Sequence, residues 1–233
     1  MVLRIVALAV IGVGLATLSA PAGGQSSSVK EALQALNDYI GGWNGSGTSE
    51  RNRTEIWKET GSWSWRFKGK DAWLTLELKN DKRFKGGELH FVPDKGSYQL
   101  TAIDLAGKPL VFQGELKRSK LYLTRVDPDT KETQQLQLNT AGGGDRLIIN
   151  YAVKPPNRTL FTKEYQVAMT REGVSFASGA KKVECIVTGG LGTMGVSYKG
   201  MTYYVCCSGC RDAFNENPEK FIKEYQERKK SGN

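Results

Sequence analysis

Residues 62–68 read SWSWRFK, and residues 72–79 read AWLTLELK. In both stretches large apolar residues alternate with polar ones. The apolar members are Trp63, Trp65, Phe67, Leu74, Leu76 and Leu78. Because successive side chains of a strand point to opposite faces of the sheet, this alternation predicts two half-buried antiparallel strands.

The same period-2 pattern continues over residues 43–170, with turn residues rich in Gly, Pro and Asp between the apolar pairs. The further members are Leu89 and Phe91, Tyr98 and Leu100, Leu121 and Leu123, Leu136 and Leu138, and Leu147, Ile149 and Tyr151. Eight to ten short strands without helical stretches between them indicate a sandwich or a closed up-and-down barrel. We predict a mainly β protein whose first domain, residues 28–170, is an antiparallel up-and-down barrel.

A short helix is predicted ahead of the strands, from a capping box at Ser28 to about Ile40. The segment that follows, residues 39–47 (YIGGWNGSG), resembles the start of lipocalin and other calycin-like barrels, which carry a Gly-x-Trp on the first strand. That resemblance implies a cavity for a small apolar ligand. The alternative, which we favour, is that the tryptophans fill the interior as ordinary core residues. They are Trp43, Trp57, Trp63, Trp65 and Trp73.

The first 22 residues have the features of a secretory signal peptide. A short region with Arg4 precedes an apolar run from Ile5 to Leu18, and small residues follow at Ala20-Pro21-Ala22. The run is too short to be interpreted first as a membrane span, although an uncleaved anchor is the alternative. We therefore expect a secreted or periplasmic protein without a membrane span after cleavage.

The net charge of +9 is spread over mixtures of Lys and Glu. Scattered charge is typical of a solvated surface, whereas nucleic-acid binding favours a basic patch with aromatic residues, so we expect no nucleic-acid partner. The one histidine, His90, lies in a strand-like run and alternates away from Leu89 and Phe91, which predicts a solvent-facing side chain. With neither a second histidine nor a nucleophile motif, the chain is expected not to be an enzyme.

All four cysteines lie in the last quarter of the chain, after a predicted linker at residues 171–182. Cys185, Cys206 and Cys210 form a C-x20-C-x3-C pattern, and Cys207 is adjacent. Thiolates hold soft ions such as zinc and copper(I). Residues 183–233 therefore indicate a small α+β thiolate module.

The residues between and after these cysteines strengthen the indication. Residues 198–206 read YKGMTYYVC, and Phe214 and the run NPEKF at 217–221 follow. This pattern resembles the YHS or TRASH metal-binding domain. The resemblance implies one thiophilic ion held by Cys185, Cys206 and Cys210. Cys207, which stands where the family often has Ser, remains a candidate fourth ligand, and the resemblance does not specify the ion.

Two helices are predicted in the module. Ser208 is expected to cap a helix that holds Cys210 in its first turn, where the helix dipole favours thiolate. Asn217 followed by Pro218 predicts a second helix to about Arg228.

Three functions remain open. The first is an exported metal-binding protein for sensing, handling or resistance, which we favour. The second is an exported thiol-disulfide protein that uses the C-x-x-C of Cys207 and Cys210, or two structural disulfides in place of a metal. The third is a small-ligand carrier in which the barrel binds the ligand and the cysteine module is structural.

Overall fold

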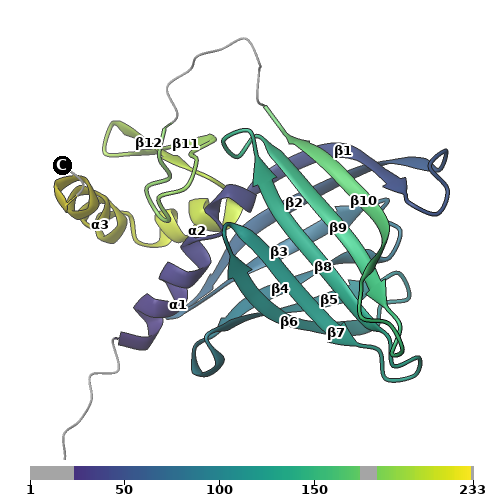
Figure 1. Ribbon diagram of the computed structural model, residues 1–233. Coiled ribbons are helices and arrows are strands. Elements are labelled where there is room, and N and C mark those ends of the chain that lie inside the picture. The colour runs from purple at the N-terminus through teal and green to yellow at the C-terminus, as the bar shows by residue number, and fades with distance from the viewer. Residues whose placement is uncertain (1–23, 174–182, 232–233) are drawn as a thin grey trace, which may run out of the picture.

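A computed structural model describes residues 24–173 and 183–231 of the chain (Figure 1). The predicted signal peptide, residues 1–22, lies outside the described residues, and so does most of the predicted linker, residues 174–182. In the described parts of the chain, none of the helices combines the length and the apolar character that a bilayer crossing requires.

Ten antiparallel strands form a closed barrel in sequence order, with β10 pairing back onto β1 (Figure 1). The strands are β1 (Gly41–Ser49), β2 (Ile56–Lys68), β3 (Asp71–Lys79), β4 (Phe84–Val92), β5 (Ser97–Asp104), β6 (Pro109–Lys117), β7 (Lys120–Val126), β8 (Thr133–Ala141), β9 (Arg146–Lys154) and β10 (Thr162–Arg171). The predicted up-and-down topology is confirmed. Closure removes both sheet edges, so each strand has two neighbours over most of its length.

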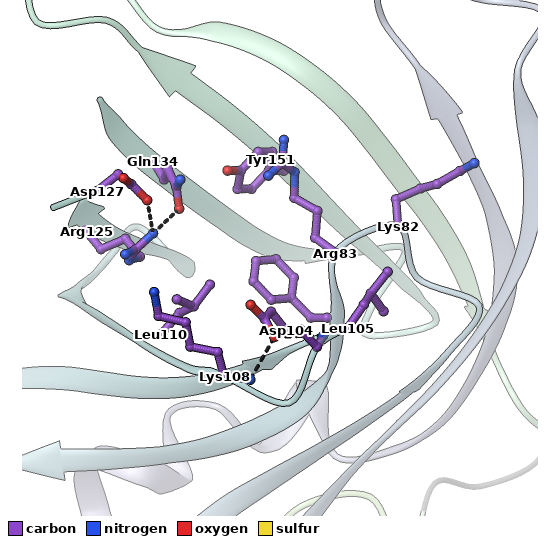
Figure 2. Close-up of a pocket in the computed structure, with 12 residues that line it drawn as sticks. Lys82, Arg83, Asp104, Leu105, Lys108, Leu110, Arg125, Asp127, Gln134 and Tyr151 are labelled. Atoms are coloured by element: carbon purple, nitrogen blue, oxygen red, sulfur yellow. Dashed lines mark hydrogen bonds and ion pairs between the residues drawn. The ribbon is translucent and has the colours of Figure 1, made fainter. Parts of the chain in front are cut away.

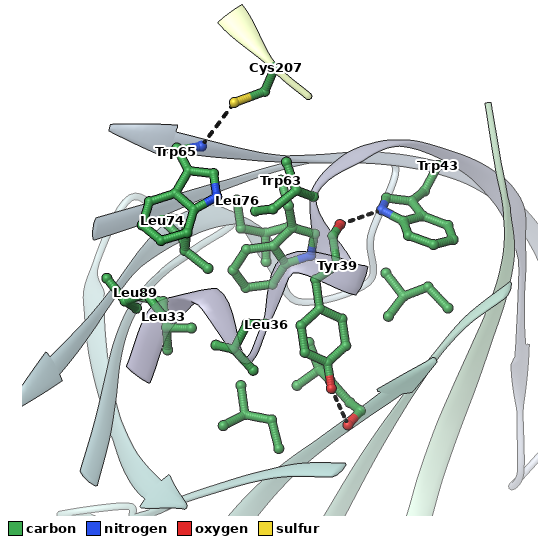
Figure 3. Close-up of a cluster of buried hydrophobic side chains, with 14 of the residues drawn as sticks. Leu33, Leu36, Tyr39, Trp43, Trp63, Trp65, Leu74, Leu76, Leu89 and Cys207 are labelled. Carbon is green, nitrogen blue, oxygen red and sulfur yellow. Dashed lines mark hydrogen bonds between the residues drawn. The ribbon is translucent and has the colours of Figure 1, made fainter. Parts of the chain in front are cut away.

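The opening helix closes one end of the barrel. The prediction of its ends is wrong: α1 (Gly24–Gln34) begins before the expected capping box at Ser28 and stops before Ile40, and a separate 3-10 turn, η1 (Asn37–Tyr39), follows it. Two hydrogen bonds hold this segment across the barrel end. The Tyr39 hydroxyl donates to the Leu138 carbonyl at 2.9 Å (Figure 3). The Tyr98 hydroxyl donates to the Ala32 carbonyl at 2.7 Å.

Three of the five tryptophans, Trp43, Trp63 and Trp65, are fully buried near the helical end (Figure 3). Trp57 and Trp73 are only partly buried. The predicted solvent-facing histidine is half-exposed and stacks on Trp73 with ring centroids 5.8 Å apart. Large aromatic side chains therefore fill the barrel behind α1, which agrees with the favoured interpretation for Trp43, Trp63 and Trp65. For Trp73, which stacks on the half-exposed His90, that interpretation is wrong.

Arg171, at the end of β10, ties the closing segment to the barrel. Its guanidinium donates to the carbonyls of Ile40, Asp38 and Gly144, and it lies 4.4 Å above the Trp43 ring. Burial lowers the pKa of this arginine, and the three carbonyl acceptors compensate for part of the lost hydration.

The cysteine module consists of a hairpin and two helices: β11 (Met194–Tyr198), β12 (Met201–Val205), α2 (Ser208–Glu216) and α3 (Pro218–Ser231). The hairpin turns at Lys199 and Gly200, both with positive φ, which is the type I′ geometry that matches strand twist. Figure 1 shows the module beside α1, outside the barrel wall. Its buried apolar residues are continuous with the barrel core.

The module docks on β2 because β1 is too short to cover it. β1 pairs with β2 only as far as Trp63, whereas β2 continues to Lys68. At the uncovered edge the first turn of α2 lies against Trp65. A Cβ on Gly209 would lie 1.8 Å from the Trp65 carbonyl oxygen, so only glycine permits this approach.

A carboxyl pair is buried farther from the module, with Glu59 near the start of β2 and Asp81 in the turn between β3 and β4. Glu59 is 1% exposed, and its Oε2 accepts from Trp57 Nε1 at 2.9 Å. Asp81 Oδ1 accepts from the backbone N–H groups of Arg83 and Phe84. Burial, followed by repulsion from Asp81, raises the pKa of Glu59 to about 8.

This pair predicts that stability falls as pH rises. An unfolded glutamate loses its proton near its ordinary pKa of about 4.3, whereas folded Glu59 keeps it until about pH 8. Between these values the native state binds the extra proton, so each rise in pH favours unfolding. We expect Glu59→Gln to flatten this slope and to stabilise the protein at pH 8, measured as the urea midpoint from pH 5 to 8.

Glu77→Gln is the matched control, because this glutamate is exposed and its removal should leave the slope as in the wild type. A wild-type midpoint that rises steadily from pH 5 to 8 would contradict the buried, protonated assignment of Glu59.

Candidate metal centre

Three sulfur atoms converge inside the module. The Sγ atoms of Cys185, Cys206 and Cys210 all lie within 4.8 Å of one another, and those of Cys206 and Cys210 are 3.4 Å apart. All three residues are buried. Four sulfurs bound to zinc at about 2.3 Å in a tetrahedron would be about 3.8 Å apart, so the spacing fits a thiolate metal site.

Cys185 reaches the cluster from a loop that folds against the end of β12. The Cys185 N–H donates to the Gly190 carbonyl at 2.6 Å, and the Ile186 N–H donates to the Tyr204 carbonyl at 2.8 Å. Gly189 has a φ of 77°, which lets the chain reverse within this short loop. These backbone contacts place a ligand from outside the C-x3-C pair next to that pair.

Cys206 and Cys210 are brought together where β12 ends and α2 begins. Cys206 follows directly after β12, and Cys210 is the third residue of α2. The predicted cap at Ser208 is wrong, because the helix begins at Ser208 and Cys207 occupies the N-cap with extended backbone angles. The predicted position of Cys210 in the first helical turn is confirmed.

Cys207 points toward the barrel. Its Sγ accepts a hydrogen bond from the Trp65 backbone N–H at 3.3 Å, at the uncovered edge of β2 (Figure 3). Cys207 lies 3.9 Å from the Cys206 sulfur but falls outside the set of three mutually close sulfurs. Cys207 therefore contacts the backbone of the barrel through Trp65, which is a contact that the structure gives to none of the other three cysteines.

The sulfurs share hydrogen bonds, and their protonation is unequal. Hydrogen bonds from Cys206 and then from Cys210 lower the pKa of Cys185 to about 2, and the same two partners lower that of Cys207 to about 3. The pKa of Cys206 is raised, mainly by its bond to Cys185, and burial raises that of Cys210. Because the raised pKa values keep Cys206 and Cys210 protonated, holding all three sulfurs as thiolates requires a nearby positive charge, which a bound metal ion would supply.

Thr188 connects the sulfur cluster to the segment that closes the barrel. Its hydroxyl lies 3.6 Å from the Cys206 sulfur. Its carbonyl accepts from the side-chain amides of Gln34 at 3.0 Å and Asn37 at 2.9 Å. Outer contacts of this kind orient metal ligands, so the barrel contributes to the geometry of the cluster.

The helix predicted after Asn217 is confirmed as α3, with Lys220 N–H donating to the Asn217 side chain at 3.3 Å. Its charged residues pair across the fold. Glu224 contacts Lys30 of α1 at 3.3 Å, and Arg228 donates to the Ile186 carbonyl at 2.8 Å. The first contact joins α3 to α1, and the second holds the loop that carries Cys185.

A family comparison matches the YHS domain to residues 193–225. The matched segment contains three of the four cysteines; Cys185 precedes it. No significant match was found among curated proteins.

Two solved structures are similar to the chain over the larger part of its length. One is the Rv2717c protein from M. tuberculosis, 17% identical, with a TM-score of 0.38, covering 60% of this chain and 97% of that one. The other is the S-type phycobiliprotein lyase CPES from Guillardia theta, 10% identical, with a TM-score of 0.39, covering 65% of this chain and 97% of that one.

Sequence reasoning missed the contribution of the barrel to this site. Gln34 and Asn37 were interpreted only as parts of a helix, and Trp65 only as a core residue. Neither amide lies near the cysteines in sequence, and a backbone N–H carries no sequence signal. The glycine at position 209, inside a predicted helix, was the one available hint of close backbone approach.

The role of Cys207 can be tested by Cys207→Ser. Because its sulfur accepts from Trp65 and lies outside the set of three, we expect metal affinity to stay within about threefold of wild type. The serine oxygen is smaller and lies closer to Cβ than the sulfur, so the contact with the Trp65 N–H lengthens, which should lower the unfolding free energy by about 1 kcal/mol. Competition with a chelator measures the affinity, and urea unfolding measures the stability. Metal loss comparable to that of Cys210→Ser would instead show a four-thiolate site.

Gly209→Ala tests the docking contact. The added methyl group meets the Trp65 carbonyl oxygen and carbon, so α2 has to move away from β2. We expect a loss of about 1–3 kcal/mol in unfolding free energy, typical of an overpacked site. Gly195→Ala is the control, since its nearest neighbour is a Thr202 methyl at 3.6 Å. Equal stability of the two variants would contradict the tight contact.

Proposed function

We propose that this chain is an exported metal-binding protein that holds one thiophilic ion, zinc or copper(I), through Cys185, Cys206 and Cys210, and acts as a binder rather than an enzyme. The observation that supports it best is the convergence of these three buried sulfurs within 4.8 Å. The YHS domain at residues 193–225 supports the same site independently.

The donor set limits which ions fit. Three thiolates suit trigonal copper(I), or zinc completed by a fourth ligand. The donors nearest to the three sulfurs are Cys207 and the Thr188 hydroxyl. A bound ion would neutralise the thiolates and link β12, α2 and the Cys185 loop, which adds folding free energy to a small module.

The thiol-disulfide alternative is disfavoured by accessibility. Cys207 is 5% exposed and Cys210 is fully buried. A thiol that exchanges with protein disulfides has to be partly exposed to attack or be attacked. The C-x-x-C of this chain lies instead against β2, beneath the docking contact with Trp65.

Export remains part of the proposal, on the basis of the apolar run from Ile5 to Leu18 and the small residues after it. A protein in that location acquires and holds metal outside the reducing cytosol. A disulfide between the closely spaced Cys206 and Cys210 would then compete with metal, which makes metal sensing or handling dependent on the redox state.

The direct test is the metal content of the full chain purified with its thiols reduced and then offered zinc or copper(I). We expect about one retained equivalent. Single changes of Cys185, Cys206 or Cys210 to Ser should each weaken retention by more than about 100-fold, because a ligand is lost rather than an outer contact. No retention, with the four sulfurs paired as disulfides by mass spectrometry, would refute the proposal.

A further inference from the structure

A second candidate site lies at the other end of the barrel, away from α1 and the cysteines. In an up-and-down barrel alternate turns lie at the same end. The turns β3–β4, β5–β6 and β7–β8 surround a cavity of about 430 Å³ there (Figure 2). This volume is within the range of small-molecule pockets.

The walls of this cavity are amphipathic. Phe84, Leu110 and the Tyr151 ring supply apolar surface. The charged residues carry four positive and two negative charges: Lys82, Arg83, Lys108 and Arg125, with Asp104 and Asp127. An excess of cations around an apolar surface favours a ligand that has both an anionic group and an apolar body.

The two aspartates are occupied by their own turns. Asp104 Oδ1 accepts from the Ala106 N–H at 2.9 Å and the Lys108 N–H at 2.8 Å. Asp127 Oδ1 accepts from the N–H groups of Asp129 and Thr130, and Oδ2 pairs with Arg125 at 3.2 Å. Their carboxylates therefore fix the conformations of the two turns. Arg125 is the only one of the four cations that they neutralise directly.

Arg83 is the cation best placed to meet a ligand. It is exposed, and its guanidinium lies 4.4 Å above the Tyr151 ring (Figure 2). Among residues 24–173 and 183–231, no carboxylate forms an ion pair with Arg83 or with Lys108. Stacking holds the guanidinium plane in place and leaves its N–H donors free for an anion.

The buried hydroxyl of Tyr151, in the cavity wall, also indicates a ligand with a polar group. Tyr151 is fully buried, lines the cavity, and its hydroxyl has no hydrogen-bond partner among the described residues. Tyr165, whose hydroxyl is also unpartnered, stacks against it with ring centroids 5.3 Å apart. A buried hydroxyl without a partner is costly, so the Tyr151 hydroxyl, which unlike that of Tyr165 belongs to the cavity lining, indicates a polar group that comes from a ligand.

We propose that this cavity binds a small amphipathic organic anion, with Arg83 contacting the anionic group, the Tyr151 hydroxyl donating to it, and the apolar body lying against Phe84 and Leu110. The site lies apart from the thiolates, so binding should not depend on metal. It also differs from an apolar ligand held deep in the barrel, where tryptophans already fill the space behind α1.

The test uses two fluorescent probes of similar shape, 1-anilinonaphthalene-8-sulfonate, which is an anion, and N-phenyl-1-naphthylamine, which is neutral. The full-length protein should bind the anionic probe at least tenfold more tightly. Arg83→Gln should weaken binding of that probe by about tenfold, the usual effect of losing a charge-assisted hydrogen bond. Lys85→Gln, an exposed charge outside the cavity lining, is the control and should change nothing.

Tyr151→Phe separates binding from structure. A ligand-facing hydroxyl predicts weaker binding of the anionic probe together with unchanged or higher thermal stability, because the variant removes an unpartnered buried polar group. Equal affinity for the two probes would overturn the proposal. So would an equal effect of Arg83→Gln and Lys85→Gln, or full binding by Tyr151→Phe.

Discussion

The peptide group of Trp65 is the contact on which the arrangement of the two parts of the molecule depends. Its N–H donates to the Cys207 sulfur, and its carbonyl oxygen lies against Gly209, which cannot carry a side chain there. Both groups are available because β1 stops short of this part of β2. The start of α2 thus satisfies a stretch of strand edge that the barrel leaves open.

This contact also explains how the barrel and the cysteine module become one structure. From the docked helix, Cys210 faces Cys185 and Cys206, and the Thr188 carbonyl accepts from Gln34 and Asn37 beside the barrel end. Removing three buried thiolates from water is unfavourable unless a cation compensates their charge. Metal binding and docking of the module are therefore expected to stabilise each other.

Sequence alone predicted the elements well and their contacts poorly. The alternation over residues 43–170 predicted the strands, because period 2 is a property of each strand by itself, and their number with the turns between them predicted a sandwich or an up-and-down barrel. The helix that starts at Pro218 followed from local conformational preferences. The Cys207 N-cap could not be predicted, because it depends on a tertiary hydrogen bond to the barrel and on no local preference.

The central claim is that three cysteine sulfurs, and not four, hold one ion. X-ray absorption spectroscopy at the edge of the bound metal counts them directly in the loaded full-length protein. The account predicts a first shell of three sulfurs at about 2.3 Å, alone for copper(I) or with one lighter atom for zinc. A shell of four sulfurs, or one made mainly of nitrogen and oxygen, would contradict it.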